Sequence, residues 1–205
     1  EMQQRLDIQG MRALAISAVL LFHFFPSQVP NGFLGVDIFF VVSGYLILSI
    51  FSKKISSNGL SYNTILEFYG RRIRRLLPLY LFFCLVAVLT FTACSTPFEI
   101  ASSQNDTINA LMFITNIDAI RRKSDYFHSA ENDKFFTHTW SLSVEMQFYA
   151  FVPLLFLARH PLFFRLQRLF LPIVALLSFC IFDLFAPSPI EAFNSPFARL
   201  WQFLA

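Results

Sequence analysis

The sequence has few charged residues, and this shortage limits what the chain can be. Only 14% of its 205 residues are charged, whereas 56% are hydrophobic and 28 are Phe. Soluble domains have about a quarter of their residues charged, so this composition argues against a soluble globular domain. The net charge of +3 is too small to predict a nucleic-acid partner. The composition indicates a membrane protein whose partners include lipid.

Cysteines are also scarce, and their positions exclude two common kinds of site. Cys84, Cys94 and Cys180 lie in or beside apolar runs, without a CxxC pair or a histidine at ligand spacing. This arrangement argues against a disulfide framework and against a metal site, so we expect no metal cofactor. The first apolar run has no small-residue cleavage site and contains Arg12 and His23, so it does not resemble a separable signal peptide.

Five apolar stretches are long enough to cross a bilayer as helices, which need about 20 residues each. They cover residues 11–29, 33–51, 76–94, 139–158 and 169–186, and a sixth begins at about 197. Runs of this length fit helices rather than the strands of a membrane barrel, which have about ten residues. We therefore predict an all-α, polytopic transmembrane helical bundle. Because the chain begins at Glu1 and ends inside an apolar pattern, we expect it to be a truncated piece of a longer bundle.

Basic residues concentrate in two connections between these stretches. Segment 52–75 has six Lys and Arg against one Glu, a net charge of +5, and segment 159–168 has three Arg and no acid. Segment 95–138 has four basic residues against six acids, a net charge of −2. The positive-inside rule predicts a cytoplasmic N-terminus and a cytoplasmic 52–75, with 95–138 on the opposite side. Within 95–138, the short apolar segment 107–120 is predicted to be a re-entrant or interfacial helix.

Charged side chains inside the apolar stretches are candidates for function, because each costs about 2.5–3.5 kcal/mol on insertion scales. Arg12 and His23 are eleven residues apart, which on a helix is about 16.5 Å and three turns, so they share one face at opposite depths. For Arg12 the alternative is an anchor that extends to the membrane interface. For His23 it is a hydrogen bond between helices. A neutral imidazole is also a good proton acceptor near pH 7.

Asp37 lies near the start of the second apolar stretch, and its role has two interpretations. A carboxylate near a helix N-terminus is favoured by the helix dipole, which predicts a structural cap. The alternative is a role in the site. Further along the same stretch, Ser43 and Gly44 are small residues that predict close packing against another helix.

Four arginines precede the third apolar stretch: Arg71, Arg72, Arg74 and Arg75. Positive residues are expected at a cytoplasmic span end, where lipid headgroups would neutralise them. Guanidinium groups also bind phosphates through two parallel hydrogen bonds, so the cluster is equally consistent with a site for a phosphorylated cytoplasmic ligand.

The fourth apolar stretch has a polar stripe, because Ser141, Glu145 and Tyr149 follow one another at helical spacing of four residues. Glu145 is the acid in the middle of this stretch. An unpaired carboxylate in a span is hard to explain structurally, so we predict a function for it, with Arg12 or His23 as its partner.

These elements resemble the acyltransferase-3 family of integral-membrane O-acyltransferases, and the resemblance covers the whole chain. They are, in order, the Arg-x10-His pattern of Arg12 and His23, the stretch GFLGVDIFFVVSGYLI at 32–47, the arginine-rich segment with Pro78, and TWSLSVE at 139–145, which contains Trp140. The resemblance implies that residues 1–205 are the first part of a larger acyltransferase-3 transmembrane domain. It also implies transfer of an acyl group, usually acetyl, from cytoplasmic acyl-CoA to a hydroxyl of a glycan, lipid or small molecule.

The resemblance also implies roles for particular residues. Arg12 and His23 match the catalytic motif, and Arg72 with Arg75 match a motif that holds the phosphates of the coenzyme. Arg71 and Arg74 offer a second register for that motif. Where the family often has two adjacent acids, this chain has one, Glu145.

Transfer from a thioester to a hydroxyl needs a base for the hydroxyl and a group that stabilises the oxyanion. We assign His23 as the base. Arg12 is too far along the helix to touch the same atom, so it either lines the donor channel or pairs with Glu145. The competing hypothesis is a transporter or lipid-binding membrane protein that does no chemistry. A third interpretation is that this stretch of chain is inactive by itself.

Overall fold

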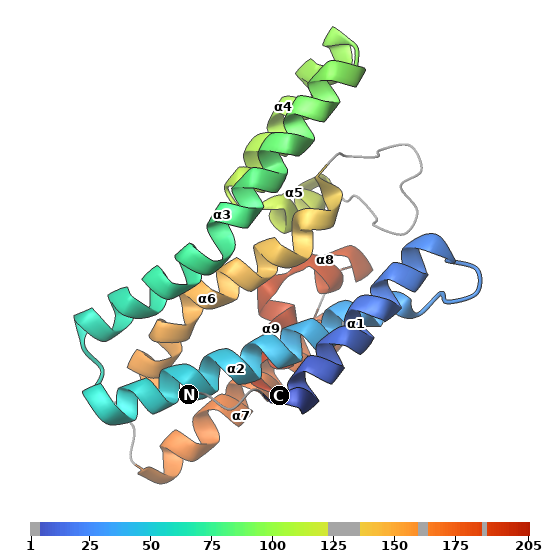
Figure 1. Ribbon diagram of the computed structural model, residues 1–205. Helices are drawn as coiled ribbons and strands as arrows, with labels where there is room; N and C mark the ends of the chain where they lie inside the picture. Colours follow the sequence, from blue (N-terminus) through green and yellow to red (C-terminus); the bar gives the residue numbers. More distant parts are fainter. Residues whose placement is uncertain (1–4, 123–135, 160–163, 186–187) are drawn as a thin grey trace.

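The computed structural model describes residues 5–122, 136–159, 164–185 and 188–205, and the regular structure in these ranges is helical (Figure 1). The prediction of an all-α fold is confirmed for the described residues. The helices are α1 (Leu6–Phe24), η1 (Gly32–Leu34), α2 (Gly35–Asn58), α3 (Tyr62–Cys94), α4 (Pro97–Leu111), α5 (Thr115–Arg122), η2 (Thr137–Thr139), α6 (Trp140–Arg159), α7 (Phe164–Cys180), the π-helix η3 (Ile181–Phe185), α8 (Pro189–Asn194) and α9 (Pro196–Leu204).

Four helical segments are long and apolar enough to cross a membrane. They are Leu6–Phe24, Gly32–Asn58, Tyr62–Cys94 and Thr137–Ala158. They overlap the first four predicted spans in order, but the first helix ends at Phe24, short of the predicted end at residue 29. The fifth predicted span, 169–186, corresponds to α7, which has 17 residues and continues into η3. The sixth predicted stretch corresponds to α9. The structure thus supports several membrane-crossing helices, while the exact number of crossings stays a prediction.

The prediction that residues 52–75 form a loop is wrong, because nearly all of this segment is helical. Helix α2 continues to Asn58 and α3 begins at Tyr62. Hydropathy marks only the apolar part of a helix, whereas Lys, Arg and Glu are good helix formers and extend it into the charged part. Gly59 ends α2 with a φ of 71°, a left-handed conformation that glycine adopts without strain. Ser61 then caps α3, since its hydroxyl accepts a hydrogen bond from the backbone of Thr64.

Helices α3 and α4 form a hairpin that projects beyond the rest of the bundle (Figure 1). The predicted helix at 107–120 is divided by a turn, since α4 ends at Leu111 and α5 begins at Thr115. Phe113 in this turn has a φ of 55°, which is unusual for a residue other than glycine. Its ring stacks on Tyr80 at 4.7 Å between centroids, so tertiary contacts hold the turn where local sequence does not predict one. The re-entrant or interfacial placement of this segment stays a prediction.

The main apolar core lies between α2, α3, α6 and α9. Its most enclosed side chains include Ile47, Phe51, Val144, Val152 and Phe203. Helix α2 contacts α9 so closely at Gly44 that a Cβ there would lie 2.0 Å from the backbone oxygen of Phe203. The packing role predicted for Gly44 is therefore confirmed.

Candidate active site

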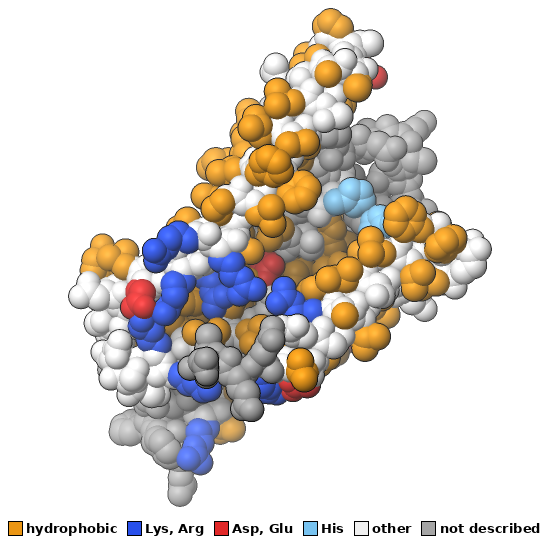
Figure 2. Space-filling model, viewed as in Figure 1, with side chains coloured by type: hydrophobic (Ala, Val, Ile, Leu, Met, Phe, Trp, Pro, Cys, Tyr) orange, Lys and Arg blue, Asp and Glu red, His pale blue; other side chains and the backbone are white. Residues whose placement is uncertain are grey.

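A cavity of about 500 Å³ lies between α1, α2, α3 and α6, and it collects polar side chains from all the predicted motifs. Its polar lining residues are Arg5, Gln9, Arg12, Ser43, Arg72, Arg75, Glu145 and Tyr149. Figure 2 shows Lys and Arg side chains gathered where the first three long helices meet. Segments far apart in the sequence therefore contribute to one positively charged cavity.

The cavity distinguishes the two registers of the arginine cluster. Arg72 and Arg75 line it, as residues three apart on one helix face do. Arg71 instead pairs with Glu67 at 2.9 Å, and Arg74 donates from Nε to the backbone oxygen of Gly70 at 3.1 Å. Arg71 and Arg74, which were predicted as a possible phosphate-binding pair, are thus not among the lining residues.

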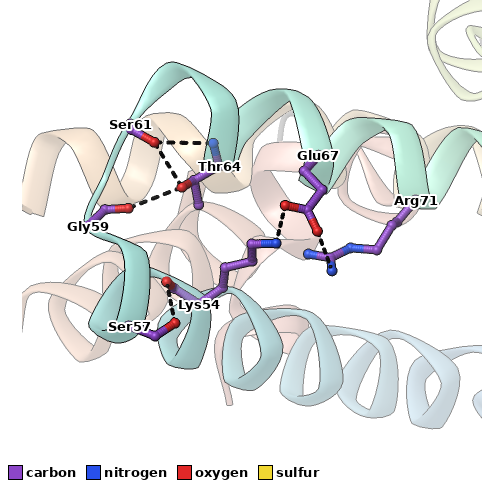
Figure 3. A network of polar contacts seen from close by, with 7 residues as sticks. All are labelled: Lys54, Ser57, Gly59, Ser61, Thr64, Glu67 and Arg71. Carbon is purple, nitrogen blue, oxygen red and sulfur yellow. Dashed lines mark hydrogen bonds and ion pairs between the residues drawn. The ribbon is translucent and has the colours of Figure 1, made fainter.

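Glu67 lies at the centre of a separate polar network at the α2–α3 turn. Figure 3 shows its carboxylate between Lys54, from α2, and Arg71, from α3. The side chains of Glu67 and Arg71 are 47% and 45% exposed. The network therefore neutralises Arg71 near the protein surface and leaves the cavity arginines to other partners.

Arg72 is enclosed but not fully satisfied by the protein. Its guanidinium lies 5.7 Å from the ring centroid of Phe68 and 5.9 Å from that of Tyr149. Its Nε is buried without a hydrogen-bond partner. In the part of the chain that the structure describes, the guanidiniums of Arg12 and Arg75 also make no ion pair. Since a buried donor without a partner costs about 1–3 kcal/mol, an anion in this cavity would be favoured.

Glu145 has two hydroxyl partners rather than a cationic one. Its Oε1 accepts short hydrogen bonds from Ser43 in α2 and from Tyr149 one turn further along α6. An ion pair with Arg12 or His23, which the sequence predicted, is not found among the described residues. The Glu145–Tyr149 contact confirms part of the predicted stripe. Ser43 was predicted only to pack, because the sequence does not say which helix α2 faces.

His23 lies outside this cavity, at the other end of α1. Its Nδ1 is 2.8 Å from the backbone oxygen of Val19. Because a carbonyl oxygen only accepts, Nδ1 must carry the hydrogen, and the lone pair of the neutral ring is then on Nε2. The ring of His138, in η2, lies 5.2 Å away between centroids. The predicted separation in depth of Arg12 and His23 agrees with this arrangement.

Asp37 forms an ion pair that the sequence did not predict. Its Oδ1 lies 2.5 Å from Nη1 of Arg199, in α9, and Arg199 is only 4% exposed. Arg199 also donates from Nε to the backbone oxygen of Phe193 at 2.9 Å. The side chain of Asp37 makes no cap for α2. The signal that was missed is a charged residue inside the sixth apolar stretch.

A second, more apolar cavity of about 710 Å³ lies beside this ion pair, lined by residues of α2, η3, α8 and α9. Trp140 is buried nearby, with its ring 4.4 Å from that of Phe193 and the Arg199 guanidinium 5.8 Å from its centroid. Trp140 therefore supports the ion pair rather than the first cavity. Ser141 is half-buried and does not line either cavity.

No group of three or more His, Cys, Asp and Glu residues in the described ranges is arranged to hold a metal ion. The three cysteines have free thiols.

Comparisons with known proteins give a consistent family assignment. A family model described as an acyltransferase domain matches residues 5–205. An O-acetyltransferase named OatA from Staphylococcus aureus strain NCTC 8325 / PS 47 is 38% identical over 151 residues, which are 72% of this chain and 24% of that protein. A putative O-acetyltransferase of strain COL is 35% identical over 150 residues, again 72% of this chain and 24% of that protein. No solved structure matches significantly.

Proposed function

Because the chain belongs to the acyltransferase-3 family, which its match over residues 5–205 shows, we propose that it is part of a multi-pass membrane O-acetyltransferase. The relatives named O-acetyltransferase support this reaction class, and the apolar helices support the membrane location. The chain spans about a quarter of the length of these curated relatives, so the activity belongs to the whole protein.

The observation that carries the proposal is the cavity lined by Arg12, Arg72 and Arg75. Acyl-CoA is the donor, and its phosphates supply the anions that these guanidiniums lack. Guanidinium groups bind phosphate strongly because their donors match its oxygens in pairs. Arg72, whose Nε is buried without a partner, provides the most enclosed contact.

The reacting atoms lie nearer to His23. The thioester of acyl-CoA is at the end of a long flexible arm, so it can be far from the phosphates. On α1, Arg12 and His23 are separated by about 16.5 Å along the helix axis. The hydroxyl of the acceptor loses its proton to Nε2 of His23 while its oxygen attacks the thioester carbonyl, and the carbon–sulfur bond then breaks. The products are the acyl ester and CoA, whose sulfur takes up a proton from solvent.

The charge pattern supports an orientation for this reaction. The N-terminus and the basic residues of 52–75 are proposed to be cytoplasmic, which gives cytoplasmic acyl-CoA access to the first cavity. The acceptor is proposed to bear a hydroxyl group, on a glycan, a lipid or a small molecule, and to approach His23.

The proposal is tested with the full-length protein in lipid nanodiscs, acetyl-CoA labelled in its acetyl group, and a panel of hydroxyl acceptors. His23→Ala is expected to abolish label transfer and the matching release of CoA thiol, while acetyl-CoA binding persists. Undiminished transfer by His23→Ala would show that another group is the base. Absence of transfer by the wild-type protein to every acceptor class would contradict the acetyltransferase assignment itself.

A further inference from the structure

We propose that His138 acts through His23, as the group that receives the proton His23 takes from the acceptor hydroxyl. The inference rests on the proposed acetyl transfer and adds a second histidine to it. The observation behind it is the position of the two rings, which lie 5.2 Å apart between centroids with their planes at 65°. Ring edges are in contact at this separation. The His23 ring is held by its bond to Val19, so the ring that turns is that of His138, whose rotation about its outer side-chain bond would direct a nitrogen toward His23.

The backbone around His138 is held firmly. The hydroxyl of Thr139 donates to the backbone oxygen of Phe136 at 2.8 Å, and it lies 3.0 Å from the hydroxyl of Thr115 in α5. The backbone N–H of Thr139 also donates to Phe136 at 3.0 Å. Because α6 begins at the next residue, η2 is tied both to α5 and to the helix that carries Glu145. His138 is thus presented to His23 from a fixed segment.

The tautomer of His23 determines which of its ring nitrogens can take up a proton. Its Nδ1–H donates to Val19, so Nε2 is the atom that accepts a proton. Once His23 is protonated, it carries a positive charge beside a second imidazole. Two adjacent imidazoles share one proton far more easily than they hold two, so the charge passes readily between them.

The aromatic rings in contact with His23 differ in their ability to carry a proton. From α1, Phe22 contacts the His23 ring at 5.3 Å, and Phe22 packs in turn on Phe33 of η1 at 5.9 Å. Neither phenylalanine can carry a proton, whereas His138 from η2 can. Both histidines are exposed in this chain, so the proton can leave His138 for water. Each turnover then moves one proton from the acceptor oxygen to His23, to His138 and to solvent, and the departing sulfur takes one proton back.

The experiment uses the full-length protein and compares His138→Ala, His138→Phe and Phe33→Ala. His138→Ala is expected to lower kcat for acetyl transfer by about 100-fold, the lower end of general acid–base contributions, without changing KM for acetyl-CoA. Added imidazole should restore part of this rate, and the rescue should rise with pH as free imidazole loses its proton. His138→Phe should stay slow because it keeps a ring but no base. Phe33→Ala opens space beside the same helix end without removing a base, so imidazole should leave its rate unchanged.

Three outcomes overturn the inference. The first is an unchanged kcat in His138→Ala, and the second is wild-type activity in His138→Phe, which would mean that the ring only fills space. The third is a loss in His138→Ala that imidazole does not relieve at any pH. A wild-type protein that transfers no acetyl overturns the proposed function and this inference together, whereas any of the three outcomes in an active protein overturns this inference alone.

Discussion

Arg199 is buried and Arg72 is half-buried, and the fold supplies them with very different surroundings. Arg199 has Asp37 at 2.5 Å, Gln202 at 3.3 Å and the backbone oxygen of Phe193 at 2.9 Å. Arg72 has aromatic rings beside it and a buried Nε without a partner. A charge that the fold has already neutralised contributes to the stability of the protein, whereas one that it leaves open suits a ligand. This difference separates two arginines that composition alone treats as equivalent.

The largest expected effect is on the satisfied pair. Asp37→Asn leaves Arg199 buried without its carboxylate, so it should destabilise the protein by about 3–5 kcal/mol. Thermal unfolding of the full-length protein in detergent measures the change. The double variant Asp37→Leu with Arg199→Met is the control, because replacing both charges by apolar groups should recover most of the stability. A single variant as stable as the wild type would mean that Arg199 does not depend on Asp37.

The next effect is on ligand binding at the open arginine. Arg72→Gln should weaken acetyl-CoA binding by about 10- to 100-fold, since hydrogen bonds to charged groups contribute about 1.5–3 kcal/mol. Calorimetric titration of the purified full-length protein measures the affinity, and both the affinity and the loss should be smaller at high salt.

Arg71→Gln is the matched control for Arg72→Gln, since Arg71 pairs with Glu67 instead of lining the cavity. Its acetyl-CoA affinity should equal that of the wild type. Equal losses in the two variants would indicate a diffuse electrostatic effect. No acetyl-CoA binding by the wild type would favour the non-catalytic transporter over the enzyme.

A smaller effect is expected from the hydroxyl that neighbours the acid of the cavity. Ser43→Ala removes one of the two donors to Glu145 and should destabilise the protein by about 1 kcal/mol. Ser56→Ala is the control, because the Ser56 hydroxyl bonds only to the backbone of its own helix. Chemical denaturation compares the two variants. If both variants lose the same stability, the hydrogen bond between Ser43 and Glu145 contributes no more than a bond from a serine to its own helix.

The smallest effect concerns Glu67 of Figure 3, whose side chain is 47% exposed. Glu67→Gln weakens its contacts with Lys54 and Arg71, but exposed ion pairs contribute little to folding. No resolvable change in Tm is expected. A loss of stability close to that of Asp37→Asn would contradict the expectation that a buried ion pair matters more for folding than a more exposed one.

The sequence predicts much of this arrangement where the information is local. Apolar runs predict four of the long helices, and helical spacing puts Arg72 with Arg75 and Glu145 with Tyr149. It does not predict which face of α3 meets the cavity. Arg72 lines the cavity whereas Arg71 pairs with Glu67 of its own helix, and which of the two does so depends on packing of the whole bundle.

Contacts between distant segments escape the sequence for the same reason. Ser43 meets Glu145, and Asp37 meets Arg199, across more than a hundred residues. Residue type makes each of these a candidate for a polar contact, but only the fold selects the partner. The turn at Phe113 is similar, since a left-handed phenylalanine follows from its tertiary contacts and not from a turn motif.

Gly44 has a mechanical consequence for the two cavities. Its backbone lies directly against Phe203 of α9, so α2 cannot slide or turn at this point without displacing α9. The next residue toward the N-terminus, Ser43, lines the first cavity, while Gln202 and Arg199 of α9 line the second. The close contact at Gly44 therefore ties a wall of the first cavity to a wall of the second. The two cavities thus share a tight helix–helix contact, which is possible because glycine has no side chain.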